Sequence, residues 1–258
     1  MAAPLSVVIA VRNEAARLPL LLADLAAEGP LLREVLVVDG GSSDGSAALA
    51  RLAGARVLAA APCRGGQLAA GVAASEAPWL LLLHGDGRLP RGWGTLLRHA
   101  MAETEGHQAS EAAGQAWAFR LAIEGGGVGL RLVEAAVTLR CLLRQLPYGD
   151  QGLLLQRSLY ERAGGMAPLP LMEDLDLVLR LRRQARIRLL PAALRVDGRR
   201  WHRLGVWRTT WRNALLRRAW RRGASAADLA ARYYGPAQAE YQKAQRRSLG
   251  SSSQPWPS

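Results

Sequence analysis

Cysteine is nearly absent from this chain. Cys63 and Cys141 are the two cysteines among 258 residues, and they lie far apart, without the spacing of a metal site. A dense disulfide framework and a cysteine-based zinc site are therefore excluded as the source of stability. We expect a reducing compartment, although two cysteines can still pair with each other.

Long hydrophobic runs and a targeting segment are also missing. The longest strongly apolar stretch, around 79–83, is far shorter than the ~20 residues that a membrane-spanning helix needs. The apolar run at the N-terminus ends at Val11 and has no basic region before it, so we expect no secretory signal. We therefore expect a cytoplasmic protein with no helix that crosses a membrane.

Lysine is scarce, whereas arginine is abundant. The chain has 34 basic and 21 acidic residues, a formal charge of +13, and Lys243 as its single lysine. This charge predicts either a solvated basic surface or attraction to lipid headgroups, a nucleotide diphosphate or nucleic acid. We expect no nucleic-acid partner, because no helix-turn-helix, zinc or RNA-binding motif accompanies the charge.

Strand-like and helix-like segments alternate through the first ninety residues. The sequence predicts strands over 5–11, 34–38, 56–58 and 79–83, and helices over 14–27, 46–52 and 65–75. Such alternation indicates an α/β fold with a mostly parallel, doubly wound sheet. Half of the residues are hydrophobic, which is ample for the core of one large domain.

The second half of the chain has weaker patterns. We predict a polar surface loop over 103–115, strands over 117–123 and 153–156, and helices over 130–146 and 173–183. We assign one large domain to 1–198, with one half at about 1–102 and the other at about 115–198. A basic helical segment follows at 199–248, and a low-complexity, disordered tail at 249–258.

Three acidic sites stand where predicted strands end or a predicted helix begins. Asp39 and Asp86 follow strands, and Glu173-Asp174 opens a helix. Strand-end carboxylates of such a sheet gather at the edge where ligands bind. Asp39 is placed to accept hydrogen bonds from a ribose or a base, or else to form a turn or helix cap. Because no glycine-rich phosphate turn follows the first strand, a dinucleotide-binding fold is disfavoured.

The other two acidic sites allow a metal ion and a proton transfer. His84-Gly85-Asp86 could bind Mg²⁺ or Mn²⁺, cations that often take one or two carboxylates together with phosphates, or it could be an ordinary strand-end turn. A carboxylate at Glu173-Asp174 could act as a general base or simply cap the helix. These arguments do not choose between Glu173 and Asp174.

Taken together and in order, these motifs resemble family 2 glycosyltransferases with the GT-A fold. The resemblance runs from about 5 to 234 and includes the segments 6–14, 38–45, 83–86 and 171–174. The chain is most similar to a bacterial subgroup described as radical-SAM/selenodomain-associated transferases. Elements at 64–71, 147–152 and 199–201 carry that closer likeness.

The resemblance implies that 1–198 is a catalytic domain, with a nucleotide-binding half at about 1–102 and an acceptor half at about 115–198. It also implies a role for each motif residue. Asp39 would contact the nucleobase or ribose, Asp86 would be the metal-binding acid, and Asp174 the catalytic base beside Glu173. The first acid of the family's Asp-x-Asp motif is His84 here, which leaves the metal open between Mn²⁺ and Mg²⁺. The residues implied for the donor and its cation are Ala10, Arg12, Glu14, Asp39, Arg64, Gln67, His84 and Asp86.

The implied reaction is an inverting, hexosyltransferase-like transfer from a UDP- or GDP-sugar to an unknown hydroxyl acceptor, with a lipid-linked acceptor as one candidate. Tyr148, Asp150 and Gln151 are placed on the acceptor side, although Asp150 could instead hold a turn. One alternative is a non-catalytic nucleotide-sugar-binding protein of the same fold. Another is a nucleotidyltransferase, whose usual glycine-rich signature near the first strand is missing.

The stretch 201–222 is rich in tryptophan and arginine and has no acid. Leu204, Trp207, Trp211 and Leu215 recur at helical spacing, so they share one helix face. Such a helix could lie on an anionic membrane, which would make the protein peripheral to the inner membrane face. The alternative is a helix that packs on the catalytic domain and leaves its arginines in water.

Overall fold

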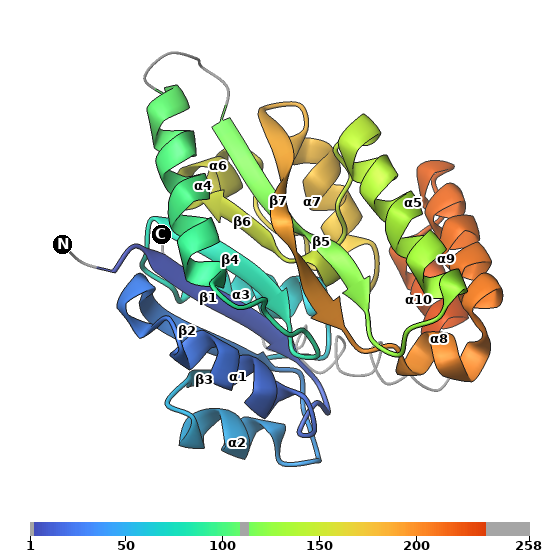
Figure 1. Ribbon diagram of the computed structural model, residues 1–258. Helices are drawn as coiled ribbons and strands as arrows, with labels where there is room; N and C mark the ends of the chain where they lie inside the picture. The colour runs from blue at the N-terminus through green and yellow to red at the C-terminus, as the bar shows by residue number, and fades with distance from the viewer. Residues whose placement is uncertain (1–2, 109–113, 236–258) are drawn as a thin grey trace, which may run out of the picture.

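A seven-stranded mixed sheet forms the centre of the molecule (Figure 1). The structure is a computed structural model and describes residues 3–108 and 114–235. The strands are β1 (Leu5–Val11), β2 (Leu32–Asp39), β3 (Arg56–Ala59), β4 (Trp79–His84), β5 (Gly114–Ile123), β6 (Leu153–Gln156) and β7 (Ala185–Val196). The sheet order is β3-β2-β1-β4-β6-β5-β7.

Helices cover both faces of this sheet. They are α1 (Leu18–Ala26), α2 (Ser46–Leu52), α3 (Arg64–Ala73), α4 (Trp93–Gln108), α5 (Val128–Arg144), α6 (Arg157–Arg162), α7 (Glu173–Leu181), α8 (Arg199–Leu204), α9 (Val206–Arg221) and α10 (Ala226–Tyr234). Short 3₁₀ turns lie at η1 (Gly29–Leu31) and η2 (Gly149–Gln151). No helix in the described part of the chain is both long and apolar enough to span a bilayer.

The strand directions confirm the predicted mostly parallel, doubly wound sheet. The first four strands in space, β3, β2, β1 and β4, are mutually parallel. β6 runs antiparallel to both of its neighbours, β4 and β5, and β7 is parallel to β5. The strand order reverses at β1, because β2 and β3 lie on one side of it and β4 on the other. A crevice for a ligand is expected at the carboxyl end of such a reversal point.

The side chains of β4 alternate between two hydrophobic layers. Leu80 and Leu82 join the layer formed by α3, α7, α9 and α10, whereas Leu81 and Leu83 join the layer under α1, α2 and α4. Because both faces of β4 are buried, its sequence is a continuous apolar run. That run therefore gives a strong signal for a central strand.

Helix α3 lies unusually close to the sheet. A Cβ added at Gly71 would stand 2.3 Å from Val8 Cγ1 and 2.8 Å from Val38 Cγ2. The missing side chain therefore lets α3 approach β1 and β2. Gln67, one turn earlier, donates hydrogen bonds from Nε2 to the carbonyls of Val11 (2.9 Å) and Val38 (2.8 Å). These contacts fix α3 across the ends of both strands.

The prediction of a surface loop over 103–115 was wrong at both of its ends. Residues 103–108 belong to α4 and residues 114–115 to β5, while 109–113 lie outside the described residues. Thr104 is buried on α4 and donates a hydrogen bond to Ala100 O, so the last turns of the helix have a core-facing side. Glu105 is exposed on the solvent side of these turns.

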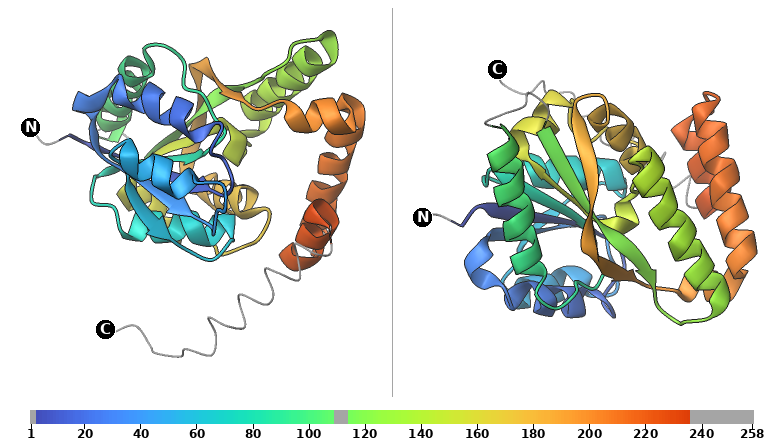
Figure 2. Two further views of the ribbon diagram at one scale, coloured as in Figure 1. Left: turned by 90° about the horizontal axis from the view of Figure 1, so that it is seen from below. Right: turned by 45° about the horizontal axis from the view of Figure 1, so that its top comes forward.

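The last helices form an arm, residues 199–234, which comprises α8, α9 and α10 and lies along one side of the molecule (Figures 1 and 2). Leu216 of α9 and Leu229 of α10 join the same hydrophobic layer as α7. One side of the arm thus packs on the domain, as one of the two alternatives predicted. The other side exposes Trp207, Trp211 and Leu215. The predicted tail at 249–258 lies outside the described residues.

Candidate active site

The ends of β1 and β4 place polar residues side by side. Ala10 of β1 pairs with His84 of β4, so the chain that follows each strand leaves the sheet at the same edge. Gly85 lies next to the turn after β1, because a Cβ at this position would meet Val11 Cγ2 at 3.0 Å and Glu14 Cβ at 3.6 Å. Glu14 and Asp86 are thereby brought to one place.

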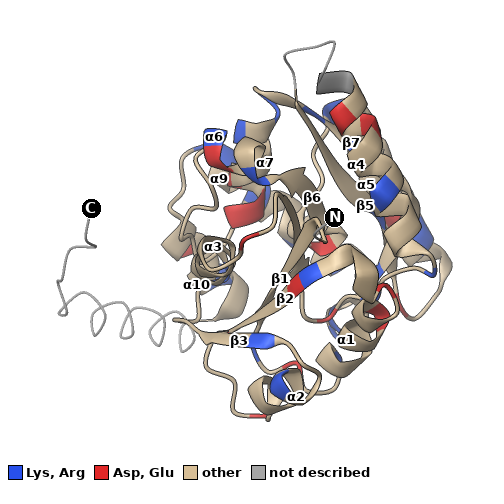
Figure 3. Cartoon of the chain, turned by 90° about the vertical axis from the view of Figure 1, so that its left-hand side faces the viewer, with Lys and Arg blue, Asp and Glu red and all other residues tan. Residues whose placement is uncertain are grey.

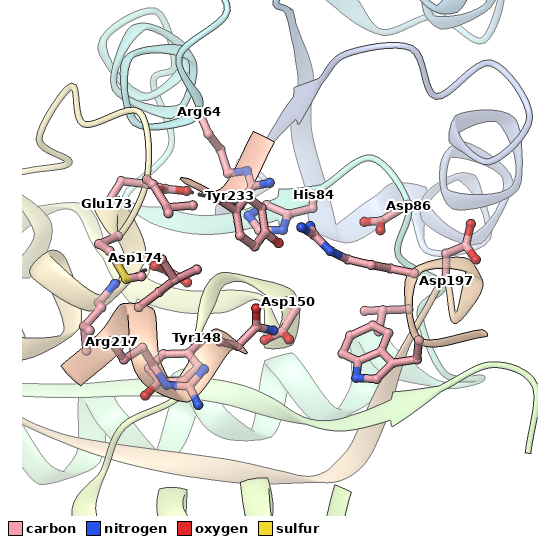
Figure 4. A pocket seen from close by; sticks show the side chains of 18 of the residues that line it. Arg64, His84, Asp86, Tyr148, Asp150, Glu173, Asp174, Asp197, Arg217 and Tyr233 are labelled. Atoms are coloured by element: carbon pink, nitrogen blue, oxygen red, sulfur yellow. Dashed lines mark hydrogen bonds and ion pairs between the residues drawn. The ribbon is translucent and has the colours of Figure 1, made fainter. Parts of the chain in front are cut away.

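A cavity of about 370 Å³ opens between this edge, the start of α7 and the arm. Figure 4 shows Asp174 on one side of it and Asp86 on the other, with His84 and Tyr233 between them. The predicted site residues that line it are Glu14, Arg64, His84, Asp86, Tyr148, Asp150, Glu173 and Asp174. The structure therefore brings Asp86, after β4, and the acids at the start of α7 to one cavity, although they are far apart in sequence.

A second cavity, of about 250 Å³, adjoins the first. Four residues line both cavities: Glu14, Arg64, His84 and Asp86. Its lining also includes the predicted donor residues Ala10, Arg12 and Gln67, together with Tyr234 of the arm. The two cavities form one continuous site with Asp86 at their junction.

Asp174 is held firmly at the start of α7. Its Oδ2 accepts a hydrogen bond from Gly149 N at 2.7 Å, and its Oδ1 accepts one from Leu175 N at 2.7 Å. The first bond ties the helix to the η2 turn, where Asp150 also lines the cavity. The carboxylate is therefore oriented by two backbone donors while it lines the cavity.

Glu173 differs from its neighbour because it is almost fully buried, with 1% of its surface exposed. Burial raises the pKa of Glu173 to about 7, and the Arg64 guanidinium, 3.4 Å away, only partly opposes this effect. Glu173 and Arg64 together join α7 to α3. The structure thus separates the two acids, with Asp174 held by backbone donors and Glu173 fixed in the layer beneath.

Asp150 is a second unusual carboxyl group. Burial raises the pKa of Asp150 to about 6, and the nearby charges of Asp174 and Asp86 add to this increase. Its Oδ1 is buried without a hydrogen-bond partner among the described residues. A ligand group that donates a hydrogen bond would satisfy this atom.

Tyr148 lies beside Asp150, and its ring is in contact with two arginines. The guanidinium of Arg140 lies 3.7 Å from its ring centroid, and that of Arg217, from α9, lies 5.1 Å away. Gln151 has a different position, because it is fully buried and is absent from the lining of both cavities. It donates to Phe119 O and accepts from Tyr148 N, so it holds the η2 turn in place.

Asp39 is also absent from the lining of both cavities. Its carboxylate accepts hydrogen bonds from the backbone N–H and the hydroxyl group of Ser42. These are the contacts of a turn residue, one of the two roles considered for it. The turn that it stabilises lies next to the first strand end, because Ser42 Oγ accepts from Asn13 N at 2.9 Å.

The electrostatics around Asp86 suit a cation. Burial and then the Asp86 charge raise the pKa of Glu14, and burial raises the pKa of Asp86 itself. Burial, together with the Arg64 charge, holds the pKa of His84 well below its usual value, so its imidazole is neutral and able to ligate a metal. These groups would be stabilised by added positive charge.

The donor set fits a cation that takes few protein ligands. No group of three or more His, Cys, Asp or Glu residues in the described ranges has metal-binding geometry. Asp86 and His84 nevertheless offer one carboxylate and one neutral imidazole at the same cavity wall. This set is compatible with Mg²⁺ or Mn²⁺ held jointly by the protein and by phosphate oxygens.

Several lining residues were not predicted as site residues. Asp197 follows β7 directly and is paired with Arg17 and Arg199, while Arg217 and Tyr233 come from the arm. The sequence did not predict β7, because charged and exposed residues interrupt its buried apolar positions. These positions include Ile187, Leu190 and Leu194. Recognising this strand would have identified Asp197 as another strand-end acid.

A comparison with known protein families matches the first part of the chain. Residues 6–109 match the family described as Glycosyl transferase family 2. A search of curated proteins found no match. The matched segment runs from β1 to α4 and includes Asp86 of the cavity wall.

Solved structures resemble a larger part of the chain. Staphylococcus aureus TarS 1-349 has a TM-score of 0.56 at 16% identity, and the match covers 76% of this chain and 60% of that one. Glucosyl-3-phosphoglycerate synthase from Mycobacterium tuberculosis, in complex with phosphoglyceric acid, has a TM-score of 0.52 at 22% identity over 75% of this chain and 70% of that one. The predicted GT-A fold is thereby confirmed. The chain spans less than two thirds of TarS 1-349.

Proposed function

We propose that this protein is a family 2 glycosyltransferase that moves a sugar from a nucleotide-sugar donor to a hydroxyl acceptor. One observation carries the proposal: Asp86, just after β4, and Asp174, in α7, line the same 370 Å³ cavity. One acid stands where a diphosphate and its cation would bind, and the other where a hydroxyl group would lose its proton. TarS has been crystallised with UDP-GlcNAc, and the mycobacterial synthase with UDP-glucose and Mn²⁺, which supports a UDP-hexose donor here, with GDP as the alternative nucleotide.

The donor is proposed to occupy both cavities. Its nucleoside would lie in the 250 Å³ cavity beside Ala10, Arg12 and Gln67, and its sugar would lie in the larger one. Arg64 and Glu14 line both and would flank the diphosphate. The contact of Asp39 with a nucleobase or ribose stays a prediction. In this arrangement, residues 1–102 form the nucleotide-binding half and 115–198 the acceptor half.

Asp86 and His84 are the proposed ligands of a divalent cation, Mn²⁺ or Mg²⁺. When bound, such a cation neutralises charge that accumulates on the departing diphosphate. Arg64 would act in the same direction, because its guanidinium lines both cavities and carries a permanent positive charge. Groups aimed at this developing charge stabilise the transition state more than the ground state.

The proposed reaction is a single displacement with inversion. The acceptor hydroxyl group donates its proton to the Asp174 carboxylate as its oxygen forms a bond to the anomeric carbon. The bond from that carbon to the diphosphate oxygen breaks on the opposite face, and the nucleoside diphosphate leaves. The hydrogen bonds from Gly149 and Leu175 fix the orientation of Asp174 and leave its remaining lone pairs for the acceptor.

The acceptor is proposed to enter beside the η2 turn. Tyr148 and Asp150 would contact it, whereas Gln151 would act by holding the turn. A lipid-linked acceptor is one candidate, and we also propose that the protein is cytoplasmic and attaches peripherally to the inner membrane face through its basic arm. Membership of the radical-SAM/selenodomain-associated subgroup is part of the same proposal and rests on the motifs at 64–71, 147–152 and 199–201.

Donor binding followed by turnover tests the proposal. Thermal-shift measurements with UDP-, GDP- and TDP-sugars, with and without Mn²⁺, should show one nucleotide class that raises the melting temperature in a metal-dependent way. Asp86→Asn should weaken metal-dependent binding at least about 10-fold, because loss of a residue that only supports a metal ligand already costs about that much. Asp176→Asn, on the α7 helix outside the cavity, should not weaken it.

The release of nucleoside diphosphate is then measured across a panel of hydroxyl acceptors. Turnover supports the transferase. Binding without release in any acceptor mixture would favour a non-catalytic nucleotide-sugar-binding protein, a reading suggested by His84 at the first acidic position. Absence of binding to every nucleotide sugar would refute both.

A further inference from the structure

Helix α5 has an exposed apolar stripe along its whole length. Its residues recur at the spacing of one helix face, and the large ones have more than half of their surface exposed. They are Val128, Leu132, Leu139, Leu142 and Leu143, with exposed fractions of 78%, 53%, 56%, 64% and 73%. Ala135 and Ala136 complete the stripe. A continuous apolar patch of this kind indicates an interaction site, whereas scattered single side chains do not.

The opposite side of α5 is buried, so the helix is well placed to present this stripe. Leu130 and Val133 pack with the ends of β5 and β7 in a small hydrophobic cluster. Glu134 accepts a hydrogen bond from Ile123 N and is paired with Arg131. The exposed leucines are therefore on a helix that is fixed to the sheet.

Helix α9 of the arm carries a second exposed apolar face next to α5. Trp207, Trp211 and Leu215 have 64%, 70% and 51% of their surface exposed. The two helices are in contact, and Val206 of α9 packs on the cluster that contains Leu130. Figures 1 and 2 show them as neighbours on the same side of the molecule. We call the exposed stripe of α5 and the exposed face of α9 together the α5–α9 surface.

Arginines accompany the apolar residues on α9. The exposed ones are Arg208, Arg218 and Arg221, whereas Arg131 of α5 is paired with Glu134. The chain has no acidic residue from 198 to 227, and the one acid of α5, Glu134, is already paired. By contrast, the side that carries α1 and α2 shows both acidic and basic residues (Figure 3). The α5–α9 surface therefore combines apolar side chains with positive charge.

We infer that the α5–α9 surface is a docking face for an anionic phospholipid bilayer. Leucines and tryptophans would enter the region between headgroups and acyl chains, while the arginines would contact lipid phosphates. Helix α5, with 17 residues, is about 25 Å long and would lie in the plane of the membrane. A second copy of the chain is a poorer occupant, because a twofold interface would place the same arginines against one another.

This inference rests on the proposed peripheral membrane attachment and is independent of sugar transfer. It adds a rigid catalytic-domain helix, α5, to the arm predicted from the sequence. The other side of α9 lines the cavity with Asn213, Leu216 and Arg217. A bilayer that holds the outer face of α9 would therefore keep its inner face over the candidate active site.

Vesicle flotation with the full chain tests the docking face. Wild-type protein should float with phosphatidylcholine vesicles that contain phosphatidylglycerol and much less with phosphatidylcholine alone. Leu139→Glu/Leu143→Glu should lower the partition coefficient at least about tenfold. Leu52→Glu is the matched control, because Leu52 is 84% exposed on α2, away from this surface, and the variant should float like wild type.

Charge and depth are measured separately. Arg208→Gln, Arg218→Gln and Arg221→Gln should each lower partitioning about fivefold at low salt. Brominated acyl chains should quench part of the tryptophan fluorescence, and Trp207→Phe/Trp211→Phe should remove that part. Nucleotide-sugar thermal shifts on the same variants should match wild type, so failure of docking and failure of donor binding are distinguishable.

Three outcomes would overturn the inference. One is wild-type protein that remains unbound with phosphatidylglycerol vesicles. Another is equal flotation of wild type and Leu139→Glu/Leu143→Glu. The third is a stable dimer in solution that this double variant dissociates, which would assign the α5–α9 surface to a second copy of the chain.

Discussion

Replacing Glu173 with glutamine should change how the stability of the protein depends on pH. Glu173 is 1% exposed, and burial raises its pKa in the folded protein to about 7 from an ordinary value of 4.5. The folded state therefore keeps the proton over a pH range in which the unfolded chain has lost it. Glu173→Gln keeps the shape of the protonated acid and removes the titration.

The sign and size of the effect follow from this difference. The stabilisation is fully present below pH 4.5 and is lost as pH rises through about 7, and a shift of this size corresponds to about 3 kcal/mol. Between pH 5 and pH 8, wild type should lose up to about 3 kcal/mol of unfolding free energy relative to Glu173→Gln.

Urea unfolding of both proteins at pH 5, 6, 7 and 8 measures this difference. Asp176→Asn on the same helix controls for the general effect of removing a carboxylate, because its ion pair with Arg180 is partly exposed. Parallel stability curves for wild type and Glu173→Gln would refute the argument. So would a wild-type protein that gains stability relative to the variant as pH rises.

Three further variants test the active site and its support. Asp174→Asn should lower kcat about 10²- to 10⁴-fold with little change in donor affinity, since it removes the proton acceptor; normal turnover would exclude this role. Gly149→Ala should also reduce kcat, because its Cβ would lie 2.7 Å from the His84 ring. A kcat equal to that of wild type in steady-state kinetics would show that the turn can move and would contradict this prediction. Gly71→Ala should cost about 1–3 kcal/mol in urea unfolding, whereas Gly66→Ala, with ordinary contacts of 3.6 Å, should not; equal stabilities would contradict the close packing of α3.

The central strands could be predicted because their burial leaves a simple pattern. β1 and β4 are covered on both faces, so each is a short, continuous apolar run with clear ends. The last turns of α4 and the whole of β7 gave weaker signals. Both carry polar residues on a solvent-facing side, and their buried positions are recognisable only once the neighbouring elements are known.

The acids of the candidate site could be located for a related reason. Asp86 follows a strand and Asp174 lies in the first turn of a helix, so topology alone places them near one sheet edge. Arg217 and Tyr233 could not be predicted, because they reach the cavity only through the packing of the arm against α7. Asp39 shows that the position of a strand end does not fix the contacts of its side chain. The strand of Asp39 ends at the predicted edge of the sheet, yet its carboxylate accepts a hydrogen bond from Ser42.

The stereochemistry of the first-formed product tests the proposed displacement most directly. Proton NMR would follow the donor that binds best in the thermal-shift screen, with water or an identified hydroxyl compound as acceptor. An anomeric configuration opposite to that of the donor, lost in Asp174→Asn, is the predicted result. A product that retains the donor configuration would contradict a single attack assisted by Asp174.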